Sequence, residues 1–344
     1  MYIVYYFHSQ YDFLSTLLHV PFMTIGWKRV ALKNPRTYTK EKQGISKTVM
    51  IRNNAELKAF LAEEVKKYKG ISVPVKAGII KRALIRWAPL SKLHPNPDDE
   101  FCMPEIGPNF SIISEYIKQF RMMRLHTREY CEEPLTVEKI RPDGYRILNG
   151  HHRWAAAMLI GYPQIPIRIV DLTQDMDIKT ILNQTKHDKR VALDLDEVVF
   201  RKENDGPLES PLPFPANKIY KERLRLGIPA LFRYLNQKGY DIWVYTAEYY
   251  SIDYIQRLFQ KYHVHVCGIV TGTGRKTSEK GSAIKKELET MIANTYVRTI
   301  HIDNNMVLSI FGKTKESQEY DIAGTPEEWS RSVLEIMEKI DQNE

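Results

Sequence analysis

Two aspartates, two residues apart, are the strongest chemical signal in the chain. Asp194 and Asp196 follow the apolar run of residues 191–193. Side chains alternate along an extended strand, so residues two apart point to the same side. In an open α/β sheet, ligands bind outside the carboxyl ends of the strands. Two carboxylates at such an opening can hold a divalent cation such as Mg²⁺ or attack a phosphorus atom.

Two later strands end in polar residues that could join this acid pair. Residues 241–245 predict a buried strand that ends at Thr246, and residues 300–302 predict another that ends at Asp303. If both strands run parallel to the first, their carboxyl ends open at the same edge of the sheet. The sequence therefore predicts one site at which these side chains converge.

The ordered set of acid pair, hydroxyl, lysine and acid resembles the haloacid dehalogenase (HAD) superfamily of phosphohydrolases, over roughly residues 188–335. The resemblance implies a Rossmann-like parallel sheet. It also implies Asp194 as nucleophile, Asp196 as general acid/base and Thr246 as a phosphoryl contact. Mg²⁺ would be held by Asp194, Asp196 and Asp303. An aspartyl-phosphate intermediate would split one difficult step into two.

The lysine of this motif has two candidates. In the HAD superfamily a lysine neutralises the phosphoryl group and the nucleophile. Lys276 and Lys280 could both reach the site, and we favour Lys280 because it opens the helical stretch nearest Asp303. The intervals from Asp196 to Thr246 and from Thr246 to Lys280 are too short for a full cap domain. By resemblance, members without a large cap have open sites and often act on polymers.

A second motif combines glycine, two histidines and arginine at a predicted helix start, residues 150–153. Glycine lets the backbone approach a ligand closely, and a helix N-terminus presents free N–H groups and a positive dipole end. Arg153 can offer a bidentate fork to phosphate oxygens, and His151 and His152 can donate further hydrogen bonds. The motif therefore predicts an anion site.

Residues 133–172, with the upstream loop at 89–101, resemble the ParB/sulfiredoxin superfamily. Members of this α+β superfamily bind CTP, ATP or ADP, so the resemblance implies a nucleotide ligand held by Asn149, Gly150, His151, His152 and Arg153. Sulfiredoxins need a cysteine directly after the glycine, and His151 at that position excludes their activity.

The histidine pair is closer to the free-serine-kinase branch, which often has aspartate where this chain has Asn149. A kinase of that branch would also use an acid in the upstream loop. Asp98, Asp99 and Glu100 are available there, and Glu100 is the preferred choice.

The charge of the chain is unevenly distributed. The net charge is +8, yet residues 1–90 hold 11 Lys and 5 Arg against 5 acidic residues, leaving about −3 for the remainder. A localised basic excess is a footprint for nucleic acid or another polyanion. Lys28, Arg29 and Arg36 lie beside Trp27 and Tyr38, a mixture suited to stacking on nucleic acid. A solvated basic face explains the same pattern equally well.

The composition favours a cytoplasmic protein with two or three domains. The 3 cysteines lack metal-type spacing, which suits a reducing compartment, and no apolar run is long enough for a membrane span. We expect a basic module at residues 1–85, a ParB-like domain at 86–172, a helical linker at 173–189 and a phosphatase at 190–344. The fold class is α/β.

These features favour a bifunctional kinase/phosphatase that processes phosphorylated nucleic acid. A first alternative is the same pair of activities on a small metabolite such as an amino acid. A second is a ParB-type DNA-binding nucleotide switch that carries a phosphatase.

Overall fold

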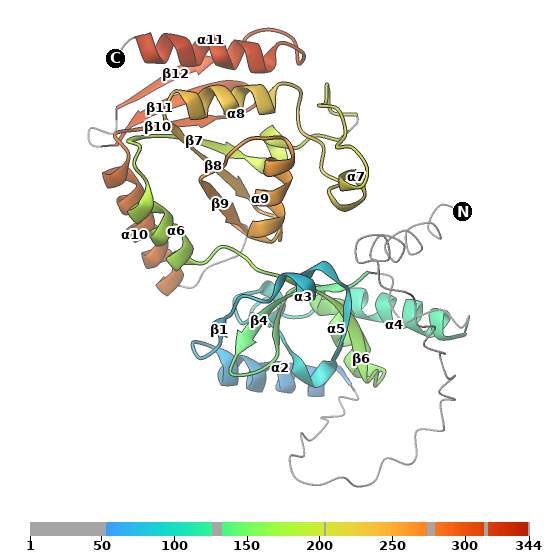
Figure 1. Ribbon diagram of the computed structural model, residues 1–344. Coiled ribbons are helices and arrows are strands. Elements are labelled where there is room, and N and C mark those ends of the chain that lie inside the picture. The colour runs from blue at the N-terminus through green and yellow to red at the C-terminus, as the bar shows by residue number, and fades with distance from the viewer. Residues whose placement is uncertain (1–52, 126–132, 203, 274–278, 313–315, 343–344) are drawn as a thin grey trace.

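The computed structural model describes residues 53–342, other than 126–132, 203, 274–278 and 313–315. Two six-stranded sheets with their helices form two lobes, the first from residues 53 to 170 and the second from 175 to 342 (Figure 1). The structure is thus a mixed α/β fold. Lys28, Arg29, Arg36 and Lys276 lie outside the described residues.

The first lobe combines a mixed sheet with four helices and two short 3₁₀ turns. Its helices are α2 (Asn54–Tyr68), α3 (Ile79–Ala83), α4 (Phe110–Leu125) and α5 (His151–Leu159), and its 3₁₀ turns are η1 (Leu90–Lys92) and η2 (Glu100–Cys102). Its strands are β1 (Val73–Pro74), β2 (Arg86–Pro89), β3 (Leu93–His94), β4 (Leu135–Arg141), β5 (Tyr145–Asn149) and β6 (Gln164–Val170).

The first sheet has the order β2-β6-β4-β5-β3, with β1 paired to β4. Strands β4 and β5 form the antiparallel hairpin that the alternating apolar pattern predicts, and β6 returns parallel to β4. Helix α5 connects β5 to β6, so the start of α5 lies at the end of the sheet where β5 finishes. The chain order therefore places the glycine motif at a strand–helix junction.

Residues 53–85, which we expected to belong to a separate basic module, pack into the first lobe. The Asn53 side chain caps α2 by accepting the N–H groups of Ala55 and Glu56, each at 3.0 Å. The buried Leu57 and Leu61 then join the same core as the buried strands of the first sheet. Each such buried leucine contributes roughly 1.5–3 kcal/mol, so α2 is held by this core.

The second lobe contains a larger, mainly parallel sheet. Its strands are β7 (Lys189–Asp194), β8 (Tyr240–Thr246), β9 (Gly268–Thr271), β10 (Arg298–Ile302), β11 (Met306–Phe311) and β12 (Ser317–Asp321). Its helices are α6 (Asp175–Gln184), the π-helical turn η3 (Leu195–Val199), α7 (Ala216–Ile219), α8 (Ile228–Gln237), α9 (Ile252–Lys261), α10 (Glu279–Thr295) and α11 (Trp329–Gln342).

The second sheet has the order β12-β11-β10-β7-β8-β9. The four strands from β10 to β9 are parallel, and β11 and β12 add to the β10 edge as antiparallel strands. The segment between η3 and α8 contains only α7 and two isolated bridges, within the described residues. The carboxyl ends of β7, β8 and β10 therefore open at one edge.

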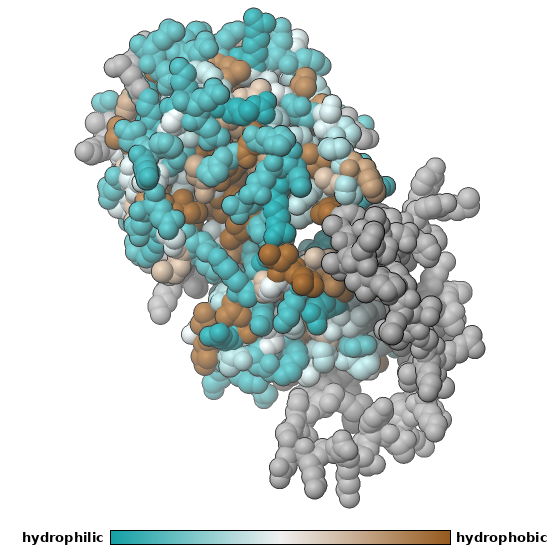
Figure 2. Space-filling model, in the orientation of Figure 1, coloured by the Kyte–Doolittle hydropathy of each residue, from teal (hydrophilic) through white to brown (hydrophobic). Residues whose placement is uncertain are grey.

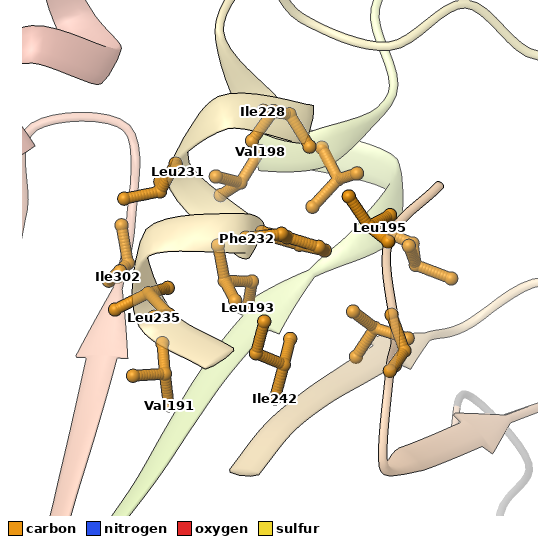
Figure 3. Packing of buried hydrophobic residues seen from close by; sticks show 14 of the residues in the cluster. Val191, Leu193, Leu195, Val198, Ile228, Leu231, Phe232, Leu235, Ile242 and Ile302 are labelled. Carbon is orange, nitrogen blue, oxygen red and sulfur yellow. The ribbon is translucent and has the colours of Figure 1, made fainter. Parts of the chain in front are cut away.

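Helices cover both faces of this sheet. One face packs against α8, α9 and α11, and Figure 3 shows side chains of β7, β8, β10 and η3 packed around Phe232 of α8. On the other face, Trp243 packs with residues of α6 and α10. Residues 173–189, which we expected to be a helical linker, thus include a helix that packs into the second lobe.

The lobes are joined by buried polar contacts around Asp171 and Thr173. The Asp171 carboxylate accepts the N–H of Ala77, and its own N–H donates to the hydroxyl of Ser251 at 3.1 Å. Thr173 exchanges hydrogen bonds with Thr271 and Ile269 at the edge of the second sheet. Buried polar groups are costly unless paired, so these contacts fix the lobes relative to each other.

The surface is mainly polar. Figure 2 shows hydrophilic residues over both lobes, with hydrophobic ones gathered near the level at which the lobes meet. Ile79 and Ile80 of α3 are exposed hydrophobic residues, with exposed fractions of 50% and 78%. No helix in the described part of the chain is both long and apolar enough to cross a membrane.

Candidate functional site

The glycine motif forms a tight turn between β5 and α5, which we call the GHHR turn (residues 150–153). Gly150 has φ = 97°, in the left-handed region. A Cβ at this position would lie 2.5 Å from Leu135 Cδ2. The left-handed backbone and this close contact therefore each require glycine. No side chain caps the start of α5. Its first N–H groups are thus left for a ligand or water, which is the arrangement of an anion site.

Arg153 supports this turn from the protein side. Its guanidinium is buried, and Nη1 donates to the Glu133 carbonyl at 2.8 Å and pairs with the Glu133 carboxylate at 2.7 Å. Nη2 lies 3.0 Å from the position that a Cβ on Gly150 would take. A buried cation needs such partners. The contact of Arg153 with phosphate oxygens stays a prediction.

The two histidines anchor the loop that precedes α4. His151 Nε2 accepts the N–H of Asn96, and His152 Nε2 accepts the N–H of Asn109, each at 3.2 Å. Burial lowers the pKa of His151 to about 4, although the nearby Asp99 carboxylate opposes this shift. Burial also lowers the pKa of His152. Both rings are therefore neutral acceptors at Nε2, where the sequence led us to expect donors to a phosphate.

The anchored loop carries the predicted acid Glu100 on η2. Asp99 begins this turn by accepting the N–H of Phe101 at 2.9 Å. The Phe101 ring stacks on His151 with ring centroids 5.4 Å apart and meets the edge of His152 at 5.0 Å. Glu100, next to Phe101, is thereby held beside the GHHR turn with its side chain exposed. Asn149 is also exposed, at the end of β5.

The second lobe brings three predicted residues to one sheet edge. Asp194 is the last residue of β7, Thr246 is the last of β8, and Asp303 directly follows β10. Lys280 lies in the first turn of α10, and its side chain is outside the described part. The structure thus gathers Asp194, Asp196, Thr246 and Asp303 as the sequence predicts.

Asp194 is held by the turn that follows it. Its Oδ1 accepts the N–H groups of Asp196 and Glu197 at 2.7 and 2.8 Å. Burial raises the pKa of Asp194, and the charges of Asp196 and Asp303 raise it further. Each of these charges opposes the ionised form of the others, so a bound cation would offset their repulsion.

Asp196 is engaged by the next strand. Thr246 is fully buried, and its hydroxyl donates to Asp196 Oδ2 at 2.7 Å. The N–H of Ala247 donates to the same oxygen at 3.2 Å. Thr246 therefore orients Asp196, a contact that sequence spacing did not predict.

Carboxylate oxygens are the ligands that Mg²⁺ prefers, so the donor chemistry of this edge fits the ion. Within the described ranges, however, no three histidine, cysteine or acidic side chains are grouped so that they could enclose a metal. Asp196, which we expected among the ligands, is turned toward Thr246. Asp194 and Asp303 are the carboxylates left to hold Mg²⁺.

A packing contact joins segments that lie next to the two sites in the sequence. Tyr249, in the loop after β8, packs against the buried cluster of Leu148, Val170 and Leu172. Leu148 lies two residues before Gly150, and Tyr249 lies three residues after Thr246. The sequence did not predict this contact, the contacts of Asp171, or Glu133 as the partner of Arg153. Asp171 directly follows an apolar strand, and Asp194 follows a similar apolar run. That shared pattern could have identified Asp171 as a candidate.

Comparisons with known proteins concern a limited part of the chain. Residues 125–185, from the end of α4 through α6, match the family model of the ParB N-terminal domain. An ATP-dependent L-serine kinase of Desulfurococcus mucosus is 40% identical over 63 residues, which is 18% of this chain and 25% of that protein. The chain thus matches about a quarter of the length of this curated relative.

Among solved structures, a mutant of a free serine kinase in complex with AMP is similar at 13% identity. The alignment covers 76% of this chain and 98% of that chain, with a TM-score of 0.22. Neither the matching family model nor the curated relative is a phosphatase. The segment from the end of α4 through α6, most of it in the first lobe, is therefore similar to the ParB N-terminal domain, and a 63-residue stretch of the chain is similar to part of an ATP-dependent L-serine kinase.

Proposed function

We propose that the first site is a nucleotide-dependent phosphotransferase that acts on the hydroxyl group of a small metabolite, such as an amino acid. The observation that carries this proposal is the uncapped start of α5 at Gly150, inside the segment similar to the ParB N-terminal domain. The similarity to an ATP-dependent L-serine kinase supports both the nucleotide and the class of acceptor.

In this proposal the N–H groups of the GHHR turn bind the phosphates of ATP or another nucleotide. Glu100, held beside the turn by Phe101, takes the proton of the attacking hydroxyl. The hydroxyl oxygen bonds to the terminal phosphorus, and the bond from that phosphorus to the nucleotide breaks. Arg153 keeps the turn in shape through Glu133, and Mg²⁺ would supply charge neutralisation when bound.

A second function is favoured by the residues at the edge of the second sheet. We propose a phosphomonoester hydrolase in which Asp194 attacks phosphorus and Asp196 protonates the leaving alkoxide, then activates water. The hydrogen bond from Thr246 holds Asp196 for this role. Lys280 would neutralise the phosphoryl group from the start of α10. Mg²⁺ held by Asp194 and Asp303 would stabilise the charge on that group.

The comparisons favour a small metabolite over the nucleic acid that the basic N-terminal part led us to expect. The nucleic-acid contacts assigned to Lys28, Arg29 and Arg36 stay predictions. A nucleic-acid ligand would make log affinity fall linearly with log salt concentration, by about 0.7–0.9 per phosphate neutralised. Salt-independent binding would leave the metabolite as the substrate.

Calorimetric titration of the full chain with ATP, ADP and CTP, each with Mg²⁺, tests the first site. We expect saturable binding of at least one nucleotide, and its absence for all three would contradict the proposal. Mg²⁺-dependent release of p-nitrophenol from p-nitrophenyl phosphate tests the second site independently, because that compound needs no nucleotide.

A further inference from the structure

A row of aromatic rings leads away from the acid pair of the second site. The ring centroids of Phe200 and Tyr250 are 6.1 Å apart, those of Tyr250 and Tyr254 5.9 Å, and those of Tyr254 and Tyr220 5.1 Å. Tyr250 and Tyr254 are nearly parallel, at 8°. Phe200 directly follows the turn that carries Asp196, so the row begins beside the reacting groups.

The row holds a carboxylate, Glu222. The hydroxyl of Tyr254 donates to Glu222 Oε2, and the N–H of Lys221 donates to the same oxygen at 3.1 Å. Burial raises the pKa of Tyr254 and of Tyr250, and the charge of Glu222 is the next cause for both. Both phenols therefore lie close to this half-buried carboxylate and stay protonated as donors.

Tyr250 connects this carboxylate with the acid pair. The charges of Asp196 and Glu248 also raise the pKa of Tyr250, after burial and Glu222. Tyr250 thus lies within electrostatic reach of Glu222 and of Asp196. A molecule whose phosphoryl group lies at Asp194 would extend its other end along these rings toward Glu222.

The neighbouring cations are directed to other acceptors. Arg257 pairs with Asp253 at 4.0 Å, Lys221 Nζ donates to the Asn217 carbonyl at 3.3 Å, and Arg223 Nη2 donates to the Glu209 carbonyl at 2.8 Å. The hydrogen bonds from the Lys221 N–H and the Tyr254 hydroxyl both end on Glu222 Oε2, and the Tyr250 side chain is a further hydrogen-bond partner of Glu222. A carboxylate can accept about four hydrogen bonds, so Glu222 keeps capacity for a further donor.

A carboxylate flanked by aromatic faces is the combination that recognises a cationic amine, through a charge-assisted hydrogen bond and cation–π attraction. We propose that Glu222, with Tyr250 and Tyr254, binds the ammonium group of the alcohol part of the substrate. The second site would then take small phosphomonoesters that carry a primary amine. This inference rests on the proposed phosphatase at Asp194 and names its class of substrate.

The test compares hydrolysis of O-phosphoethanolamine, which carries an ammonium, with that of glycerol 3-phosphate, which carries none. We expect wild type to prefer O-phosphoethanolamine in kcat/KM. Glu222→Gln should lower kcat/KM for that substrate by about 10- to 100-fold, the range for a hydrogen bond to a charged group. Hydrolysis of glycerol 3-phosphate and of p-nitrophenyl phosphate should change little.

Two further variants sharpen the comparison. Tyr254→Phe keeps the ring but removes the hydroxyl that orients Glu222, so it should weaken the preference in part. Glu319→Gln removes the same charge from the edge strand β12, which is separated from β7 and β8 by β11 and β10. This variant should behave as wild type. An unchanged substrate preference in Glu222→Gln, with p-nitrophenyl phosphate still hydrolysed, overturns the ammonium subsite.

Failure of the phosphatase itself gives a different result. In that case wild type hydrolyses none of the three compounds. Calorimetric titration with O-phosphoethanolamine and Mg²⁺ then still tests the subsite, because binding does not require turnover. Weaker binding by Glu222→Gln than by wild type supports the subsite, and equal affinity, or no binding by either protein, overturns it.

Discussion

The guanidinium of Arg82 forms a buried ion pair with the carboxylate of Asp171 where the two lobes meet. The other side of the same guanidinium contacts Asp253 of α9 at 2.9 Å. Arg82→Ala would leave both acids without this cation. Breaking a buried pair from one side costs about 3–5 kcal/mol, and we expect a loss of that size in the free energy of unfolding.

Arg257→Ala is the control for this change. Arg257 pairs with the same Asp253 at 4.0 Å, but its side chain is 44% exposed. Exposed pairs contribute roughly 0–1 kcal/mol. Urea denaturation of both variants separates the two cases, and a similar loss in each would contradict the central position of Arg82.

Gly150→Ala should impair nucleotide binding more than any change of surface charge nearby. A residue with a side chain pays about 1–3 kcal/mol to adopt the left-handed backbone of Gly150. The added Cβ would also lie 2.5 Å from Leu135 Cδ2. Gly78→Ala is the matched control, because no atom lies within 4 Å of its added Cβ. Calorimetry with ATP should show lost or weakened binding for the first variant only. Equal affinities would remove the GHHR turn from the nucleotide site.

His151 predicts a pH dependence of stability. Its pKa is about 4 in the folded protein and about 6.5 when unfolded, so the unfolded chain binds more protons between these values. Its contribution is complete above pH 6.5 and is lost as the pH falls toward 4, by roughly 3 kcal/mol. His151→Gln keeps an acceptor but takes up no proton.

The measurement is urea denaturation at several pH values between 7 and 4. Wild type should lose roughly 3 kcal/mol more than His151→Gln over this interval. The exposed His263 provides the control, since His263→Gln should follow wild type. Parallel curves for wild type and His151→Gln would show that His151 is not buried as a neutral ring.

Asp194→Asn should abolish phosphomonoester hydrolysis. The amide keeps the shape and can still accept the N–H groups of Asp196 and Glu197, but it cannot act as a nucleophile. We expect a loss of at least ~10³-fold in kcat, in the range found when a member of a catalytic unit is removed. Turnover of p-nitrophenyl phosphate close to that of wild type would reject the assignment of Asp194.

Local patterns predicted much of the fold. The apolar runs before Asp194 and Thr246 predicted β7 and β8, because buried parallel strands are nearly continuous in apolar residues. The hairpin of β4 and β5 followed from alternation around a Pro-Asp-Gly turn. Strand β12 carries mostly polar residues at a sheet edge, so no comparable pattern marked it.

The site was less predictable, because side-chain partners depend on the tertiary fold. Spacing brought Asp194, Thr246 and Asp303 to one edge, since parallel strands share their carboxyl ends. It could not show that Arg153 would turn to Glu133 or that His151 would accept a hydrogen bond from Asn96. These contacts join segments brought together only by packing.

The most direct test of the phosphotransferase uses the full chain with Asp194→Asn, which prevents hydrolysis of the product. This protein is incubated with Mg²⁺, serine and ATP labelled in its terminal phosphate. The account predicts that labelled O-phosphoserine accumulates, and that adding Gly150→Ala to the same protein reduces its formation. Binding of ATP without transfer of label to serine or to any other hydroxyl amino acid would contradict the account.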